Sequence, residues 1–182
     1  MTASATPLGQ VIDANTLRME RTLAAPIDTV WSFLVEPAKR QRWLAGGTRP
    51  TAAGACFDLR FDNDALTGET TPPRFQQFAG VHCMAARVIE MQAPRLLVMS
   101  WQEGSPNESE VRFELEPRGE HTHLTLTHSR LARREGMLNV AGGWHAHLDV
   151  LEDVLAERAP RPFWTNFGEK EAAYDRLIPA AS

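Results

Sequence analysis

The period of the apolar residues changes once along the chain, and this change constrains the fold more than any other feature. Through residues 54–128 apolar and polar side chains alternate, as they do around Phe57 and Leu59, which is the period of half-buried β-strands. Further along, the period is helical, because Trp144 and Leu148 belong to an apolar stripe on one side of a helix. A sheet with one apolar face and a helix with one apolar stripe must cover each other, which predicts an α+β protein.

Turn residues mark where the expected elements begin and end. Pro and Gly residues between the alternating segments predict an antiparallel meander, with strands at about residues 55–62, 78–90, 95–102, 111–116 and 121–128. A first strand over residues 16–23 precedes two short helices over residues 27–35 and 38–43, and a final short helix is expected over residues 169–177. One long helix cannot fill a broad curved sheet by itself, so with the two short helices we expect a cavity between the sheet and the long helix. The resulting cavity is the natural place for a small molecule.

Length and composition exclude several classes of protein. The chain has 182 residues, of which 43% are hydrophobic, so we expect a single domain over residues 15–182 after a flexible lead-in over residues 1–14. The net charge is -4 and no basic stripe is present, so no nucleic-acid partner is expected. The longest strongly apolar run, residues 96–99, is too short for a membrane span. Residues 1–10 lack the pattern of a signal peptide, so the expected location is the cytoplasm.

Sequence motifs for metal, cofactor or nucleophilic chemistry are missing. Cys56 and Cys83 form no CxxC motif and are expected to be buried thiols. His121 and His123 share a strand face, but no third zinc ligand is specified. The pair Gly142–Gly143, expected at the start of the long helix, lacks the context of a phosphate-binding loop and favours close packing or a flexible helix entry. We therefore expect no metal and no cofactor.

Two histidines expected on the apolar faces of the sheet and the long helix are the main candidates for polar chemistry in the cavity. By strand alternation His128 faces the apolar side, and His147 approaches it from the helix opposite. An imidazole that faces a cavity can orient a ligand or transfer a proton. The alternative, a core histidine satisfied by a backbone carbonyl, stays open. His145 is expected on the polar side of the helix with Asp149.

Large aromatic residues at strand and helix ends are candidates for the wall of the cavity. Trp101 is expected at a strand end and Trp144 at the helix start, where core packing is the alternative for both. The complete set of candidate ligand-binding residues is Phe57, Met99, Trp101, Phe113, His128, Trp144, His147, Leu148 and Leu151. In this set the apolar residues bury a hydrophobic ligand, and the two histidines orient its polar end.

Several short motifs, in this order, resemble a known family. They are Glu20-Arg21-Thr22-Leu23-Ala24-Ala25-Pro26 with Val30-Trp31, Glu36-Pro37 with Arg42-Trp43, Pro94-Arg95-Leu96-Leu97-Val98 with Trp101, Thr122-Leu124-Leu126-Thr127-His128, and Gly143-Trp144 with Leu148 and Leu151. The chain thereby resembles the START-related helix-grip (SRPBCC) superfamily from about residue 15 to residue 158. Within it, the chain is most similar to the group named after the activator of heat-shock protein 90 ATPase. The resemblance implies a curved antiparallel sheet wrapped around a long C-terminal helix, with two short helices after the first strand.

The resemblance implies function only in outline. Members of the superfamily bind lipids, sterols or polyketides, so the leading expectation is a protein that binds a small hydrophobic molecule in an apolar pocket. The alternatives are a cyclase- or hydrolase-type enzyme using a pocket histidine, and an interaction module like the chaperone activator. The eukaryotic activator has an additional N-terminal domain that helps engage the chaperone, and this chain has no room for one, so a chaperone partner is not favoured. Whether there is turnover, and whether the chain forms a homodimer, stay open.

Overall fold

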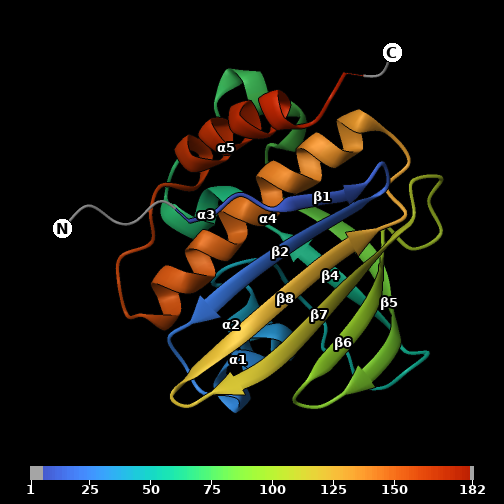
Figure 1. The fold of residues 1–182 in the computed structure, drawn as a ribbon, viewed down its shortest axis with the longest axis vertical. Helices are drawn as coiled ribbons and strands as arrows, with labels where there is room; N and C mark the ends of the chain where they lie inside the picture. The colour runs from blue at the N-terminus through green and yellow to red at the C-terminus, as the bar shows by residue number, and fades with distance from the viewer. Residues whose placement is uncertain (1–5, 181–182) are drawn as a thin grey trace.

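A curved sheet of eight antiparallel strands forms the body of the molecule (Figure 1). The computed structural model describes residues 6–180. The strands are β1 (Gln10–Asp13), β2 (Thr16–Leu23), β3 (Gly46–Gly47), β4 (Cys56–Phe61), β5 (His82–Gln92), β6 (Leu96–Trp101), β7 (Ser109–Arg118) and β8 (His121–Ser129). Their order in the sheet is β1-β2-β8-β7-β6-β5-β4-β3, so the chain returns from β8 to pair with β2.

Helices lie on one side of the sheet. They are α1 (Ile27–Val35), α2 (Pro37–Arg40), α3 (Asn63–Thr67), the 3₁₀-helix η1 (Pro73–Phe78), α4 (Arg134–Leu155) and α5 (Phe163–Leu177). In Figure 1 the long helix α4 passes behind β1 and β2, α5 lies on α4 at the top, and α1 and α2 lie at the lower end. This is the helix-grip arrangement expected from the sequence, in which the sheet curls around α4.

Strand alternation and the helical stripe meet in one core. Along β2 the buried and exposed residues alternate, which places Leu17 and Leu23 inside. From α4, Leu148 and Leu151 enter the same cluster with no exposed surface. Because the apolar residues of the strands and those of α4 face the same core, the sheet and α4 bury each other's apolar faces.

Some elements differ from the expectation. Residues 1–14, predicted to be a flexible lead-in, contain β1, which pairs with β2, while residues 1–5 lie outside the described part of the chain. The polar stretch after β4 contains α3 and η1 rather than a loop alone. The final helix, α5, begins at Phe163, directly after Pro162, whose fixed backbone suits a helix start.

Helix α4 also begins earlier than the sequence suggested, at Arg134. The pair Gly142–Gly143 therefore lies inside the helix and not at its start. A methyl group at Gly142 would lie 3.4 Å from Cε2 of Phe167 and 3.5 Å from Cβ of Glu171 on α5. A methyl group would just fill the space between the two helices here, so Gly142 lies at a close-packed helix contact and not at a helix entry.

Two expectations about burial were wrong. Cys56 and Cys83 are exposed, because both belong to the outward-facing residues of β4 and β5. His145 and Asp149 are fully buried rather than solvated, because α5 covers the side of α4 that carries them. The amphipathic pattern of a helix cannot reveal a second helix that covers its polar side.

Candidate functional site

A cavity of about 590 Å³ lies between the sheet, the first half of α4, α5 and η1. Its apolar lining is mainly aromatic and consists of Leu44, Phe61, Phe78, Met84, Trp101, Val140, Trp144, Phe163, Trp164 and Phe167, among others. Polar side chains, among them Asn63, Ser109, Asn139 and His147, also border it, and an apolar aromatic wall with polar groups at its edge is typical of a site for a small organic molecule. Of the nine residues proposed from the sequence, Trp101, Trp144 and His147 line this cavity.

Ring contacts between neighbouring elements build the cavity wall. The ring centroids of Trp101 and Trp144 are 5.0 Å apart, and those of Phe61 and Trp101 are 5.9 Å apart. The ring of His147 lies 6.4 Å from that of Phe61 and 4.7 Å from that of Phe163. Each contact joins residues from different strands or helices, so the wall depends on the tertiary fold rather than on one segment.

His128 supports the wall from behind. The indole Nε1–H of Trp144 donates a hydrogen bond to Nδ1 of His128 over 2.9 Å. Nε2 of His128 lies 2.7 Å from the hydroxyl oxygen of Ser109. Burial lowers the pKa of His128 to about 3, so its ring is neutral at pH 7. Both ring nitrogens are occupied, which places His128 as the group that holds Trp144.

His147 has a different position. Its Nδ1 lies 2.7 Å from the backbone carbonyl oxygen of Trp43, and the ring lines the cavity. Burial lowers the pKa of His147 to about 4, although the hydrogen bond to Trp43 opposes the shift. The ring is therefore neutral at pH 7. No partner of Nε2 is present among residues 6–180.

The remaining proposed residues lie apart from the cavity. Phe57, Met99 and Phe113 border a void of only about 10 Å³ under the sheet. Leu148 and Leu151 are fully buried in the core between the sheet and α4. The sequence pattern thus identified residues that face the interior. In the structure, some of these residues pack in the core and others border the cavity.

Aromatic residues of α5 and η1 are the part of the site that the sequence analysis missed. Phe78, Phe163, Trp164 and Phe167 all line the cavity. Phe163 and Phe167 are spaced by one helical turn, a signal that would have extended the final helix toward its observed start. The position of η1 carries no comparable signal, because its two Phe residues stand among Pro, Arg and Gln.

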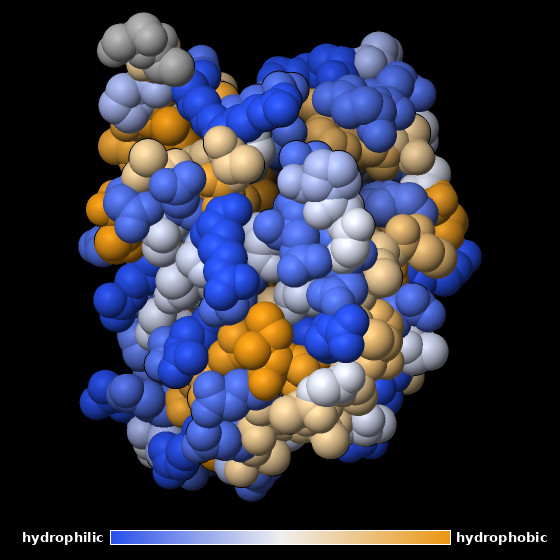
Figure 2. Space-filling model, turned by 90° about the vertical axis from the view of Figure 1, so that its right-hand side faces the viewer, coloured by the Kyte–Doolittle hydropathy of each residue, from blue (hydrophilic) through white to orange (hydrophobic). Residues whose placement is uncertain are grey.

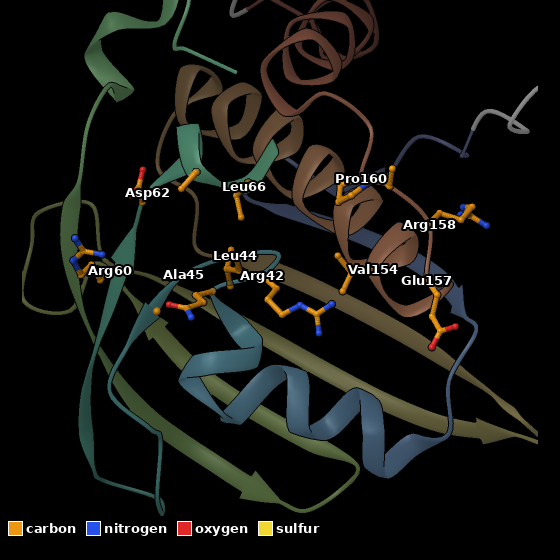
Figure 3. Close-up of a pocket in the computed structure, with 14 residues that line it drawn as sticks. Arg42, Leu44, Ala45, Arg60, Asp62, Leu66, Val154, Glu157, Arg158 and Pro160 are labelled. Carbon is orange, nitrogen blue, oxygen red and sulfur yellow. The ribbon is translucent and has the colours of Figure 1, made fainter. Parts of the chain in front are cut away.

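A second cleft of about 680 Å³ lies at the other end of α4, between α2, α3 and the segment after α4 (Figure 3). Charged side chains, including Arg42, Arg60 and Glu157, surround it. Figure 3 shows the side chains of Arg60 and Arg158 pointing away from one another. These two guanidinium groups therefore do not converge on a common point. Leu44 borders both this cleft and the aromatic cavity.

A buried network of charges lies on the opposite side of α4 from the cavity. Arg21 of β2 lies 3.6 Å from Asp149, and Arg161 lies 3.3 Å from the same carboxylate. His145 joins the network directly, with its Nε2 3.5 Å from Asp149, while its Nδ1 lies 2.9 Å from the hydroxyl of Tyr174 on α5, whose pKa is raised by burial to about 12. These contacts fix β2, α4 and α5 together, so we assign the network to the support of the fold.

The outer face at β5 carries both polar and apolar residues. Figure 2 shows this side of the molecule, with hydrophobic patches bordered by hydrophilic residues. Val81 and Ile89 are among the exposed large hydrophobic residues. Within residues 6–180, no group of three His, Cys, Asp or Glu side chains could hold a metal ion. No helix of the described chain is long and apolar enough to cross a membrane.

Comparison with known proteins agrees with this fold. A family model described as "Activator of Hsp90 ATPase homolog 1-like protein" matches residues 24–156. No curated protein matches the chain significantly.

Among solved structures, a protein from Bordetella parapertussis is 44% identical, with a TM-score of 0.80 over 97% of this chain and 94% of that chain. CalU16 from Micromonospora echinospora is 24% identical, with a TM-score of 0.66 over 95% of this chain and 96% of its own. Protein MLL2253 from Mesorhizobium loti is 23% identical, with a TM-score of 0.62 over 78% of this chain and 97% of its own. The last two similarities concern the fold alone.

Proposed function

Because the chain belongs to the family of Activator of Hsp90 ATPase homolog 1-like proteins, we propose that it binds a small hydrophobic molecule in the aromatic cavity beside α4. The observation that carries this proposal is the cavity itself, which has a volume of about 590 Å³. Aromatic residues from β4, η1, β6, α4 and α5 line it. Burial of apolar ligand surface would supply the affinity, at about 0.8 kcal/mol for each CH₂ group.

Packing around the cavity supports a preformed site. Trp144 is held by His128, and His147 is held by the carbonyl of Trp43. Arg40 fixes the segment after α2 by donating to the carbonyl oxygens of Ala45 and Gly46 over 2.9 and 2.8 Å. A wall fixed by hydrogen bonds loses little conformational entropy when a ligand enters.

The alternative functions have less support from the geometry. An enzyme using His128 as an acid or base would need a free ring nitrogen, and both nitrogens of His128 are occupied. His147 is the better candidate for such a role, because it lines the cavity. For a chaperone-binding module, no observation on the described surface indicates the partner.

A matched pair of substitutions on α4 tests the proposal. Val140 lines the aromatic cavity, Val154 lines the charged cleft, and both are half-buried. Val140→Trp should fill the cavity and lower the affinity for naphthalene-sized apolar probes at least tenfold in calorimetric titrations. Val154→Trp, which adds the same volume at the other end, should leave that affinity unchanged.

Native mass spectrometry of the freshly purified protein gives an independent measurement. A bound molecule that leaves on denaturation, and is absent from Val140→Trp, would identify the ligand class directly. Equal probe affinity in both tryptophan variants would count against the aromatic cavity as the binding site.

A further inference from the structure

The direction of the hydrogen bonds around His128 determines what Ser109 can offer. An indole N–H only donates, so Nδ1 of His128 accepts from Trp144. A neutral imidazole carries one proton, which must then be on Nε2, and Nε2–H donates to the Ser109 oxygen. The hydroxyl hydrogen of Ser109 is consequently free to donate elsewhere. Ser109 lines the cavity, and its hydroxyl has no second partner among the described residues.

The same reasoning gives the opposite result for His147. A backbone carbonyl only accepts, so Nδ1 of His147 carries the proton and donates to Trp43. The lone pair is then on Nε2, which has no partner within residues 6–180. His147 retains 6% of its surface exposed and lines the cavity. It therefore presents a hydrogen-bond acceptor, whereas Ser109 presents a donor.

Charge at the cavity limits the ligand further. Besides His147, the acidic and basic side chains in its lining are His82, Arg133 and Glu135, and all three are exposed. Ser109, at 4% exposure, and His147 are buried and lie among aromatic residues. An ionised ligand group placed beside Ser109 and His147 would lose its hydration without a buried opposite charge among the lining residues, which is costly.

We propose that the cavity selects an uncharged aromatic molecule carrying both an O–H or N–H donor, bound by Nε2 of His147, and a carbonyl-type acceptor, bound by the hydroxyl of Ser109. This inference rests on the proposed function, since it describes the ligand of the same cavity. Ser109 and His147 act as specificity residues, and the aromatic walls supply the apolar contact.

The two histidine tautomers provide a test that needs no ligand. In long-range ¹H–¹⁵N correlation spectra at pH 7, His128 should show the pattern of a ring protonated at Nε2. His147 should show the pattern of a ring protonated at Nδ1. The assignments follow from loss of each signal in a His128→Gln and a His147→Asn variant. The reversed tautomer at either ring would overturn the proposal, because the donor or the acceptor would then be lost.

Two pairs of probes test the selectivity by calorimetric titration. 2-Naphthol and 2-methoxynaphthalene differ in the donor, and 2-acetylnaphthalene and 2-isopropenylnaphthalene differ in the acceptor. We expect 2-naphthol and 2-acetylnaphthalene to bind about threefold to tenfold more tightly than their partners, the usual range for one hydrogen bond. The anion 2-naphthoate should bind more weakly than all four.

Variants then assign each preference to its residue. His147→Asn keeps a donor for the Trp43 carbonyl but removes Nε2, so it should abolish the preference for 2-naphthol alone. Ser109→Ala should abolish the preference for 2-acetylnaphthalene alone, and Ser109→Thr, which keeps the hydroxyl, should restore it. If all four neutral probes bind equally well to the wild type, the inference fails while the proposed function stands. If no probe binds, the proposed function itself fails.

Discussion

Arg40 shows how one buried side chain can fix the segment around Leu44, the residue that borders both the aromatic cavity and the charged cleft. It is 2% exposed and donates to carbonyl oxygens of Ala45, Gly46 and Thr48, and among residues 6–180 no carboxylate pairs with it. Burial lowers its pKa to about 10, so it stays charged at pH 7. The guanidinium therefore serves as a multiple donor that holds the segment next to Leu44.

Removal of this donor should destabilise the protein. Arg40→Met leaves the carbonyl groups buried without partners, so we expect a loss of about 2–4 kcal/mol in the free energy of unfolding. Urea denaturation measures the change. The control is Arg42→Met, two residues away and exposed, which should cost less than about 1 kcal/mol. Equal losses in both variants would contradict the role given to Arg40.

At the scale of elements, the contact between α4 and α5 leaves little room beside Gly142. A side chain at Gly142 meets Phe167 and Glu171, whereas a side chain at Gly143 meets only Phe167, at 3.9 Å, and faces the cavity. Gly142→Leu should overpack the helix contact and lower the free energy of unfolding by about 1–3 kcal/mol. Gly143→Leu should be neutral or stabilising, since it also replaces a helical glycine. Thermal unfolding of the two variants, compared side by side, decides between these outcomes.

The elements with a clear period were predictable, and the irregular ones were not. The helix over Ile27–Val35 and the strand over Thr16–Leu23 follow from local pattern and a Pro boundary, and the structure has both where they were expected. β1 is too short to show a period, and β3 consists of Gly46 and Gly47, whose strand state depends on pairing with β4. The sequence predicts only residues 169–177 of helix α5, because the aromatic first turn of this helix lies between Pro162 and a polar stretch.

The candidate site was predictable only in part, for a related reason. Strand alternation and helical stripe identify inward-facing residues such as Trp101 and Trp144, and these do line the cavity. They do not separate inward residues that pack, such as Phe113 and Leu148, from those that border empty space. That distinction depends on how α5 and η1 cover the end of the sheet, which is tertiary information.

For the whole molecule, the buried neutral histidines predict how stability changes with pH. His128 and His147 have folded-state pKa values of about 3 and 4, below the ordinary 6.5 of an unfolded chain. The unfolded chain therefore binds more protons than the folded one below pH 6.5, so stability should fall as the pH falls from 6.5 toward 4. Each histidine contributes at most about 1.4 kcal/mol per pH unit.

Urea denaturation between pH 7 and pH 5 measures this slope. His147→Asn should lower the slope by about the contribution of one histidine, and His121→Asn, at an exposed position, should leave it unchanged. A wild-type stability that does not change over this range would show that the two rings are not held neutral by the fold.

The pair of tryptophans in the cavity wall gives the protein an optical signal of its own. Trp101 and Trp144 have ring centroids 5.0 Å apart and planes inclined by 51°. At this separation the electronic transitions of two indoles couple, and the skewed arrangement makes the coupling visible as a pair of circular dichroism bands of opposite sign. Trp101→Phe should remove the pair. A molecule that enters beside these rings should also change their emission, so occupancy of the cavity could be followed without any label.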